Sequence, residues 1–222
     1  MGAWLWIPLG LRLAAPFLKK EGAAPVLLVL RVFRRDAEVE WLFDQIIERW
    51  RYSGSVVLIA GSDLASRTLA PDDLFAYMEG SIAQRYIKDE ATLKEQLAKL
   101  DTRPDADGRY RVNDFYCYDT TWQSVLMALV GRADRVLMDL RGLSENSRGC
   151  LYELQALSEA NHLTKIVLLT DGNTDTKAAE AALSRAADSR VIWQDASRVD
   201  AAKAEDILRA LLEAKARSGN RN

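Results

Sequence analysis

Short runs of apolar residues alternate along this chain with longer segments in which apolar residues recur every three or four positions. Unbroken apolar runs are typical of parallel strands buried on both faces, whereas the longer spacing predicts helices that cover a sheet. Strands are predicted at residues 26–33, 55–60, 136–140, 165–169 and 190–193. Helices are predicted from Asp36 to about 52, from Pro71 to about 87, at 88–100, from Thr120 to about 130, around Glu153, at 174–187 and at 200–215.

Strands that alternate with helices predict an α/β fold, with a parallel sheet and helices on both faces. About five strands favour a flavodoxin-like arrangement in the order 2-1-3-4-5. Residues 88–118 fit this repeat poorly, because a charged helix is followed by a short strand or hairpin around Asp107 and Gly108. We therefore expect one α/β domain at residues 25–217 with an inserted region at about 88–118, and a disordered tail at 218–222.

The predicted strand order indicates where a ligand would bind. The chain reverses its direction across the sheet between the strands at 26–33 and 136–140, and ligands of such sheets bind at the carboxyl ends of the strands beside the reversal. Glu153 lies in the next helix, on the shoulder of its apolar stripe, where a carboxylate is costly unless it has a partner or a function. The residues expected to face one another there are Arg34, Arg35, Asp36, Asp139, Arg141, Gly142 and Glu153.

The helix that carries Glu153 also resembles a known motif. Its positions Ser147, Cys150, Leu151, Glu153 and Leu154 resemble the serine, cysteine, leucine, glutamate and leucine of the helix motif in TIR (Toll/interleukin-1 receptor) domains. One position differs, because the tryptophan that precedes the cysteine in that motif is Gly149 here. The five-strand TIR arrangement covers about residues 26–215. The same strand, loop and helix also resemble those of the nucleoside deoxyribosyltransferases, in which an equivalent glutamate attacks the sugar.

The TIR resemblance implies cleavage of an N-glycosidic bond, with Glu153 as the catalytic residue and NAD+ as a substrate that yields nicotinamide and ADP-ribose. It also implies self-association. Nicotinamide leaves as a neutral molecule and needs no general acid, so one carboxylate suffices where most glycosidases use two. A glycine-rich phosphate loop is absent, and arginine is suited to hold the pyrophosphate. The expected substrate-binding residues are Arg34, Arg35, Asp36, Asp139, Arg141, Gly142 and Ser147.

Two other functions fit the same sequence. A non-catalytic TIR-like module for protein interaction or signalling is favoured by the missing tryptophan at Gly149, and its partner surface would lie at residues 62–86 and 88–118. A deoxyribosyltransferase-like enzyme would instead use Glu153 on a nucleoside.

Several candidate residues also have a purely structural interpretation. Glu153 could form an ion pair with Arg141 or Arg148, since acidic residues are favoured near the start of a helix. Asp139 could cap its own loop, because aspartate side chains bond to backbone groups two residues on. His162 is expected near the carboxyl end of its helix. The tryptophans Trp41, Trp50, Trp122 and Trp193 are expected in the core or at its edge.

Charge and composition exclude several classes of partner. The 30 basic and 32 acidic residues nearly cancel and form no long basic stripe, so nucleic acid is not an expected partner. The two cysteines, Cys117 and Cys150, both lie in apolar surroundings, which indicates reduced core thiols in the cytoplasm. With His162 as the single histidine and no closely spaced cysteine pair, no metal site is expected.

The amino-terminal segment, residues 1–24, is apolar and rich in tryptophan, with Trp4 and Trp6 near its start. Its apolar part, residues 3–17, is interrupted by prolines and an arginine and is shorter than the roughly 20 apolar residues that a membrane span requires. We expect an interfacial anchor, the stub of a longer membrane segment, or an arm packed on the domain. Lys19 and Lys20 follow this apolar part, so a membrane contact would leave the α/β domain on the cytosolic side.

Overall fold

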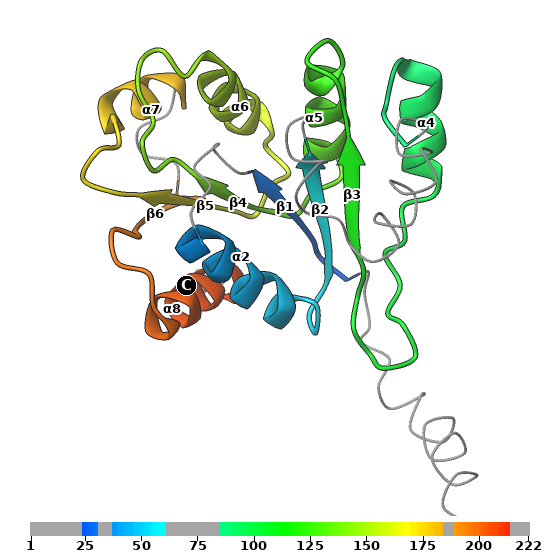
Figure 1. Cartoon of the computed structure of the whole chain (residues 1–222), viewed down its shortest axis with the longest axis horizontal. Coiled ribbons are helices and arrows are strands. Elements are labelled where there is room, and N and C mark those ends of the chain that lie inside the picture. The colour runs from blue at the N-terminus through cyan, green and yellow to red at the C-terminus, as the bar shows by residue number, and fades with distance from the viewer. Residues whose placement is uncertain (1–23, 31–36, 61–84, 184–188, 214–222) are drawn as a thin grey trace, which may run out of the picture.

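A computed structural model of the chain describes residues 24–30, 37–60, 85–183 and 189–213 (Figure 1). The expectations for the apolar amino-terminal segment, for most of the helix that starts at Pro71 and for the tail at 218–222 fall outside these residues. The last residues expected in that helix, 85–87, are described and are not helical, since Ile87 forms a parallel bridge with Cys117. No helix among the described residues is both long enough and apolar enough to cross a membrane.

The described strands form one six-stranded sheet, in which every neighbouring pair is parallel. The strands are β1 (Val26–Leu30), β2 (Ser55–Ala60), β3 (Val112–Tyr116), β4 (Arg135–Asp139), β5 (Lys165–Thr170) and β6 (Val191–Asp195). Their order in the sheet is β3-β2-β1-β4-β5-β6. The chain therefore winds outward from β1 to β3, returns to β4 beside β1, and then winds outward to β6.

Helices cover both faces of this sheet (Figure 1). One face is covered by α2 (Ala37–Trp50) and α8 (Ala201–Leu212), and the other by α5 (Trp122–Val130), α6 (Arg148–Glu159) and α7 (Thr176–Ala182). The short helix α4 (Glu90–Ala98) adds Leu93 to the core on the α5 side. Its start is fixed by Asp89, whose Oδ1 accepts a hydrogen bond from the backbone N–H of Thr92 at 2.8 Å.

The unbroken apolar runs of the sequence are explained by these two cores. In β1, Leu27 and Val29 point into the core under α2 and α8, while Leu28 and Leu30 point into the core under α5 and α6. All four are at most 2% exposed. A strand with a core on each side has no solvent-facing positions, so its polar residues are confined to its ends.

The predicted α/β fold, its parallel sheet and the helices on both faces are confirmed. The expected order 2-1-3-4-5 is found when β3 is left out, but the sheet has six strands. The sixth is β3, in the region interpreted as an insertion, and it pairs in parallel with β2. Its edge position explains the error, because only Phe115 and Tyr116 of this strand are buried and its pattern is not that of a central strand. The turn predicted at Asp107 and Gly108 is present, closed by an antiparallel bridge from Pro104 to Tyr110.

The expected positions of His162 and of the tryptophans are only partly correct. Helix α6 ends at Glu159, so His162 lies in the turn beyond it, and its Nε2 lies 2.8 Å from the carbonyl oxygen of Val130 at the end of α5. It thus caps a neighbouring helix. Trp50 is fully buried, whereas Trp41 on α2 and Trp193 on the edge strand β6 are 40% and 37% exposed.

The close approach of the turn before β2 to the chain before β1 yields the first prediction. A Cβ atom at Gly54 would lie 2.0 Å from the carbonyl oxygen of Pro25. Gly54→Ala therefore requires the backbone to move, and we expect a loss of about 2 kcal/mol in the free energy of unfolding, measured by urea denaturation. The control is Gly149→Ala, because the space around Gly149 in α6 is open. Alanine there should stabilise the helix by roughly 0.5–1 kcal/mol. Equal effects at both positions would contradict this packing.

Candidate functional site

The loop that follows β4 is organised by a buried ion pair between Asp139 and Arg141. These residues are only 1% and 5% exposed. Arg141 donates from Nε to Asp139 Oδ1 at 2.9 Å and from Nη2 to Asp139 Oδ2 at 2.8 Å. The backbone N–H of Arg141 also donates to Asp139 Oδ1, at 3.0 Å. Asp139 therefore caps its own loop, as its structural interpretation predicted, and it neutralises a buried guanidinium.

The next part of this loop is held by Asp171, which follows β5 and was not among the predicted site residues. Gly142 has a positive φ of 77°, a conformation that glycine adopts without a steric penalty. Its N–H donates to Asp171 Oδ1 at 3.2 Å. The same oxygen accepts from the backbone N–H of Asn173 at 3.0 Å and lies 2.9 Å from Thr174 Oγ1. Aspartate directly after an apolar strand, followed by glycine and asparagine, is the sequence signal that could have identified this turn.

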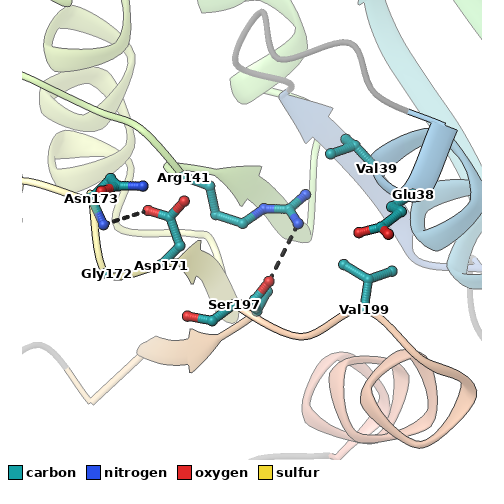
Figure 2. A pocket seen from close by; sticks show the side chains of 9 residues that line it. Glu38, Val39, Arg141, Asp171, Gly172, Asn173, Ser197 and Val199 are labelled. Carbon is teal, nitrogen blue, oxygen red and sulfur yellow. Dashed lines mark hydrogen bonds between the residues drawn. The ribbon is translucent and has the colours of Figure 1, made fainter.

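A pocket of about 270 Å³ lies at the carboxyl ends of β4, β5 and β6, beside the first turn of α2 (Figure 2). Arg141 extends between the Asp171–Asn173 turn on one side and Glu38 and Val199 on the other. Its Nη1 lies 3.4 Å from the carbonyl oxygen of Ala196. The pocket is on the α2 and α8 side of the sheet, because Ala196 and Val199 belong to that core.

Glu153 lies on the opposite side of the sheet. It belongs to α6, whose buried residues Cys150 and Leu154 are part of the core shared with α5. Its side chain is partly buried, and loss of contact with water raises its pKa to about 7. Within the described residues, no hydrogen bond or ion pair holds the carboxylate. The ion pair with Arg141 or Arg148 that the structural interpretation expected for Glu153 is not found among these residues: Arg141 pairs with Asp139, and no pair of Glu153 with Arg148 is present.

The predicted site residues thus separate into two groups. Asp139, Arg141 and Gly142 lie together at the pocket edge of the sheet, whereas Glu153 lies beyond Cys150 on α6. Glu153 and Asp139 are nevertheless close enough to each other that both carboxylates influence the pKa of the Cys150 thiol. Burial raises the pKa of Cys150 to about 12, and the charges of Glu153 and Asp139 contribute to this increase.

The remaining predicted residues lie elsewhere. Arg34, Arg35 and Asp36 fall outside the described residues. Ser147 is the N-cap residue of α6, but its hydroxyl makes no capping bond to the helix and instead accepts from the backbone N–H of Ser144 at 3.1 Å. Gly149, where the TIR motif has a tryptophan, is exposed with open space around it.

Two aromatic side chains are in contact between α5 and α6. Trp122, the first residue of α5, packs edge-on against Tyr152, with ring centroids 5.4 Å apart. Tyr152 directly precedes Glu153 on α6 and is 36% exposed. Cys117, which directly follows β3, lies within reach of the Glu153 charge; burial is the main cause that raises the pKa of this thiol to about 11. Neither cysteine is therefore suited to act as a nucleophile at neutral pH.

Two further features of the described residues bear on function: a hollow between two helices, and the lack of a cluster of metal ligands. A hollow of about 440 Å³ lies between α4 and α5, lined by apolar residues such as Leu93 and Leu97 and by charged residues such as Lys94 and Arg132. It lies partly in the region 88–118 to which an interaction module would assign its partner surface, and that assignment stays a prediction. No group of three or more histidine, cysteine or acidic side chains in the described part of the chain is arranged to hold a metal ion.

Comparison of the chain with models of protein families, with curated proteins and with solved structures gives no match. Its class is therefore defined by the structure itself. It is an α/β protein with a six-stranded parallel sheet in a flavodoxin-like arrangement. A polar pocket and a partly buried glutamate lie near the carboxyl edge of this sheet, on opposite faces.

The buried ion pair generates a stability prediction. Asp139→Asn removes the carboxylate that compensates the buried Arg141 guanidinium, and we expect a loss of about 3 kcal/mol in the free energy of unfolding. The matched control is Asp206→Asn, which breaks the exposed pair with Arg209 and should change stability by less than about 1 kcal/mol. Denaturant titrations of both variants measure the difference. A loss at Asp139 as small as that at Asp206 would show that the pair does not organise the loop.

The raised pKa of Glu153 predicts a pH-dependent difference in stability. The folded state holds this proton more tightly than the unfolded chain, so wild-type stability falls as pH rises from about 4.5 to about 7. Glu153→Gln has no carboxyl group to ionise at this position, so its stability should not fall over this pH range for that reason. Because the side chain is only partly buried, we expect the variant to be more stable by about 2 kcal/mol at pH 8 and nearly equal at pH 4.

The control for this measurement is Glu159→Gln, at an exposed position of the same helix. Thermal unfolding of the three proteins between pH 4 and pH 8 gives the comparison. A Glu153→Gln variant that matches the wild type at every pH would mean that Glu153 is solvated or paired.

Proposed function

We propose that this protein cleaves an N-glycosidic bond, that its substrate is NAD+, and that Glu153 is the catalytic residue. The observation that carries the proposal is the Glu153 carboxylate, which is removed from water without a cationic partner among the described residues. A cationic group of a ligand would compensate this cost. NAD+ carries such a group in its nicotinamide ring, at the bond that would break.

The chemistry requires only one carboxylate. The bond between ribose C1′ and the nicotinamide nitrogen breaks, and its electron pair stays on the nitrogen, which becomes neutral. The positive charge passes to the ribose, where an ionised Glu153 stabilises the oxocarbenium-like transition state. Water then adds to C1′ and releases a proton, which gives ADP-ribose. We expect the Trp122–Tyr152 pair, in which Tyr152 directly precedes Glu153 in α6, to offer aromatic surface to a flat leaving group.

The position of Glu153 in the fold supports this proposal. Open parallel sheets bind ligands beyond the carboxyl ends of their strands, near the point where the strand order reverses. Here that point lies between β1 and β4, and α6 follows β4. A strongly perturbed carboxyl group at such a place is a candidate for function on physical grounds.

The test is release of nicotinamide from NAD+, measured over a range of protein concentrations because TIR-like enzymes often require self-association. We expect Glu153→Gln to reduce kcat by at least about a hundredfold, with Glu159→Gln as the control that keeps full activity. Since Glu153 must be ionised in the free protein, kcat/KM should increase with pH, with a midpoint near pH 7, and level off above it. Cation binding favours the carboxylate, so the midpoint for kcat should lie lower.

The same assay separates the other functions. Wild-type protein that releases no nicotinamide at any concentration would overturn the proposal. In that case, transfer of deoxyribose from a deoxynucleoside to a free base would identify the deoxyribosyltransferase-like activity. Loss of self-association on substitution at the α4–α5 hollow, with no turnover of either substrate, would instead identify an interaction module.

A further inference from the structure

The pocket beside Arg141 is separate from Glu153 and has chemistry of its own. It lies on the α2 and α8 face of the sheet, whereas Glu153 lies on the α5 and α6 face. Its volume of about 270 Å³ is slightly below the roughly 300 Å³ at which typical small-molecule pockets begin. The pocket is therefore suited to one sugar or nucleoside unit and is too small for a whole dinucleotide.

The charges in the pocket argue against an anionic ligand. The guanidinium of Arg141 is compensated by Asp139, with which it makes two side-chain hydrogen bonds. Asp171 holds its own turn, since one of its oxygens already accepts the N–H groups of Gly142 and Asn173. The Glu38 carboxylate adds a negative charge. Among the described residues that line the pocket, Arg141 is the only cation and Asp139 already compensates it, so this part of the site disfavours a phosphate or carboxylate ligand.

Two polar side chains of the pocket remain available to a ligand. Neither the carboxylate of Glu38 nor the side-chain amide of Asn173 makes a hydrogen bond within the described residues. The two lie on opposite sides of Arg141 (Figure 2). Beside Glu38 the pocket is lined by the half-buried Val199 and by the largely buried Val39, which present apolar atoms to it. A carboxylate next to an apolar wall suits a neutral ring that donates from adjacent hydroxyl groups, because both carboxylate oxygens can accept.

We propose that this pocket binds a ribose ring through its 2′ and 3′ hydroxyl groups, which donate to Glu38, while the ring packs on Val39 and Val199 and Asn173 bonds to a further polar atom of the ligand. The ligand is a ribonucleoside or the ribonucleoside part of a larger molecule. If the proposed function is correct, a dinucleotide would place its second ribose here and its scissile bond near Glu153, across the carboxyl edge of the sheet.

The experiment measures binding of adenosine and 2′-deoxyadenosine to the full chain by isothermal titration calorimetry. We expect adenosine to bind at least about ten times more tightly, because a lost hydrogen bond to a charged group weakens binding by this much or more. Glu38→Gln and Asn173→Ala should each weaken adenosine binding severalfold or more. The matched control is Glu40→Gln, an exposed acidic position two residues further along the same helix that does not line the pocket, which should change nothing.

The outcomes distinguish this inference from the proposed function. Adenosine binding that persists in Glu153→Gln but is lost in Glu38→Gln supports the pocket, whether or not NAD+ is cleaved. Equal binding of the two nucleosides, or no binding of adenosine by the wild type, overturns the inference even if NAD+ is turned over. Binding of the diamine putrescine that depends on Glu38, in place of adenosine binding, would show a site for cations and would also overturn it.

Discussion

Burial of the central strands on both faces is the constraint on which the rest of this structure depends. Residues 136–140, which span most of β4 and its end, have almost no exposed surface, so the strand offers no place for a solvated charge. The first charged residue at its carboxyl end, Asp139, is itself buried. It is retained because Arg141 returns to it with two hydrogen bonds, which fixes the direction of the following loop. That loop then carries Gly142, the contact with Asp171 and one wall of the pocket.

The sequence predicted the elements whose surroundings are uniform. Central strands such as β1 and β5 have apolar neighbours on both faces, and their continuous apolar runs identify them without further information. The edge strand β3 was predicted only as a short strand or hairpin of an insertion and not as part of the sheet, because only its last two residues are buried and its pairing with β2 depends on distant parts of the chain. His162 was misplaced for a similar reason, since its partner is the carbonyl of Val130, 32 positions away in the sequence.

In the candidate site, too, the sequence predicted local contacts but not contacts between distant segments. The self-capping role of Asp139 is local and could be predicted, because it involves a backbone group two residues on. The choice of Arg141 as the partner of Asp139, and not of Glu153, depends on which face of the sheet each side chain reaches. Asp171 could not be connected to Gly142 from spacing, since the two are 29 positions apart and meet only through the parallel pairing of β4 with β5.

Glu153 differs from Asp139 in that no cation among the described residues compensates its loss of contact with water. A direct titration of this group is therefore the measurement that tests the account best. In protein labelled with carbon-13 at the glutamate side-chain carboxyl, the signal that disappears in Glu153→Gln should titrate near pH 7, and saturating NAD+ added to the wild type at low protein concentration should lower that midpoint. Titration near pH 4.5, unchanged by NAD+, would contradict the claim that Glu153 is a desolvated carboxylate that binds a cationic substrate.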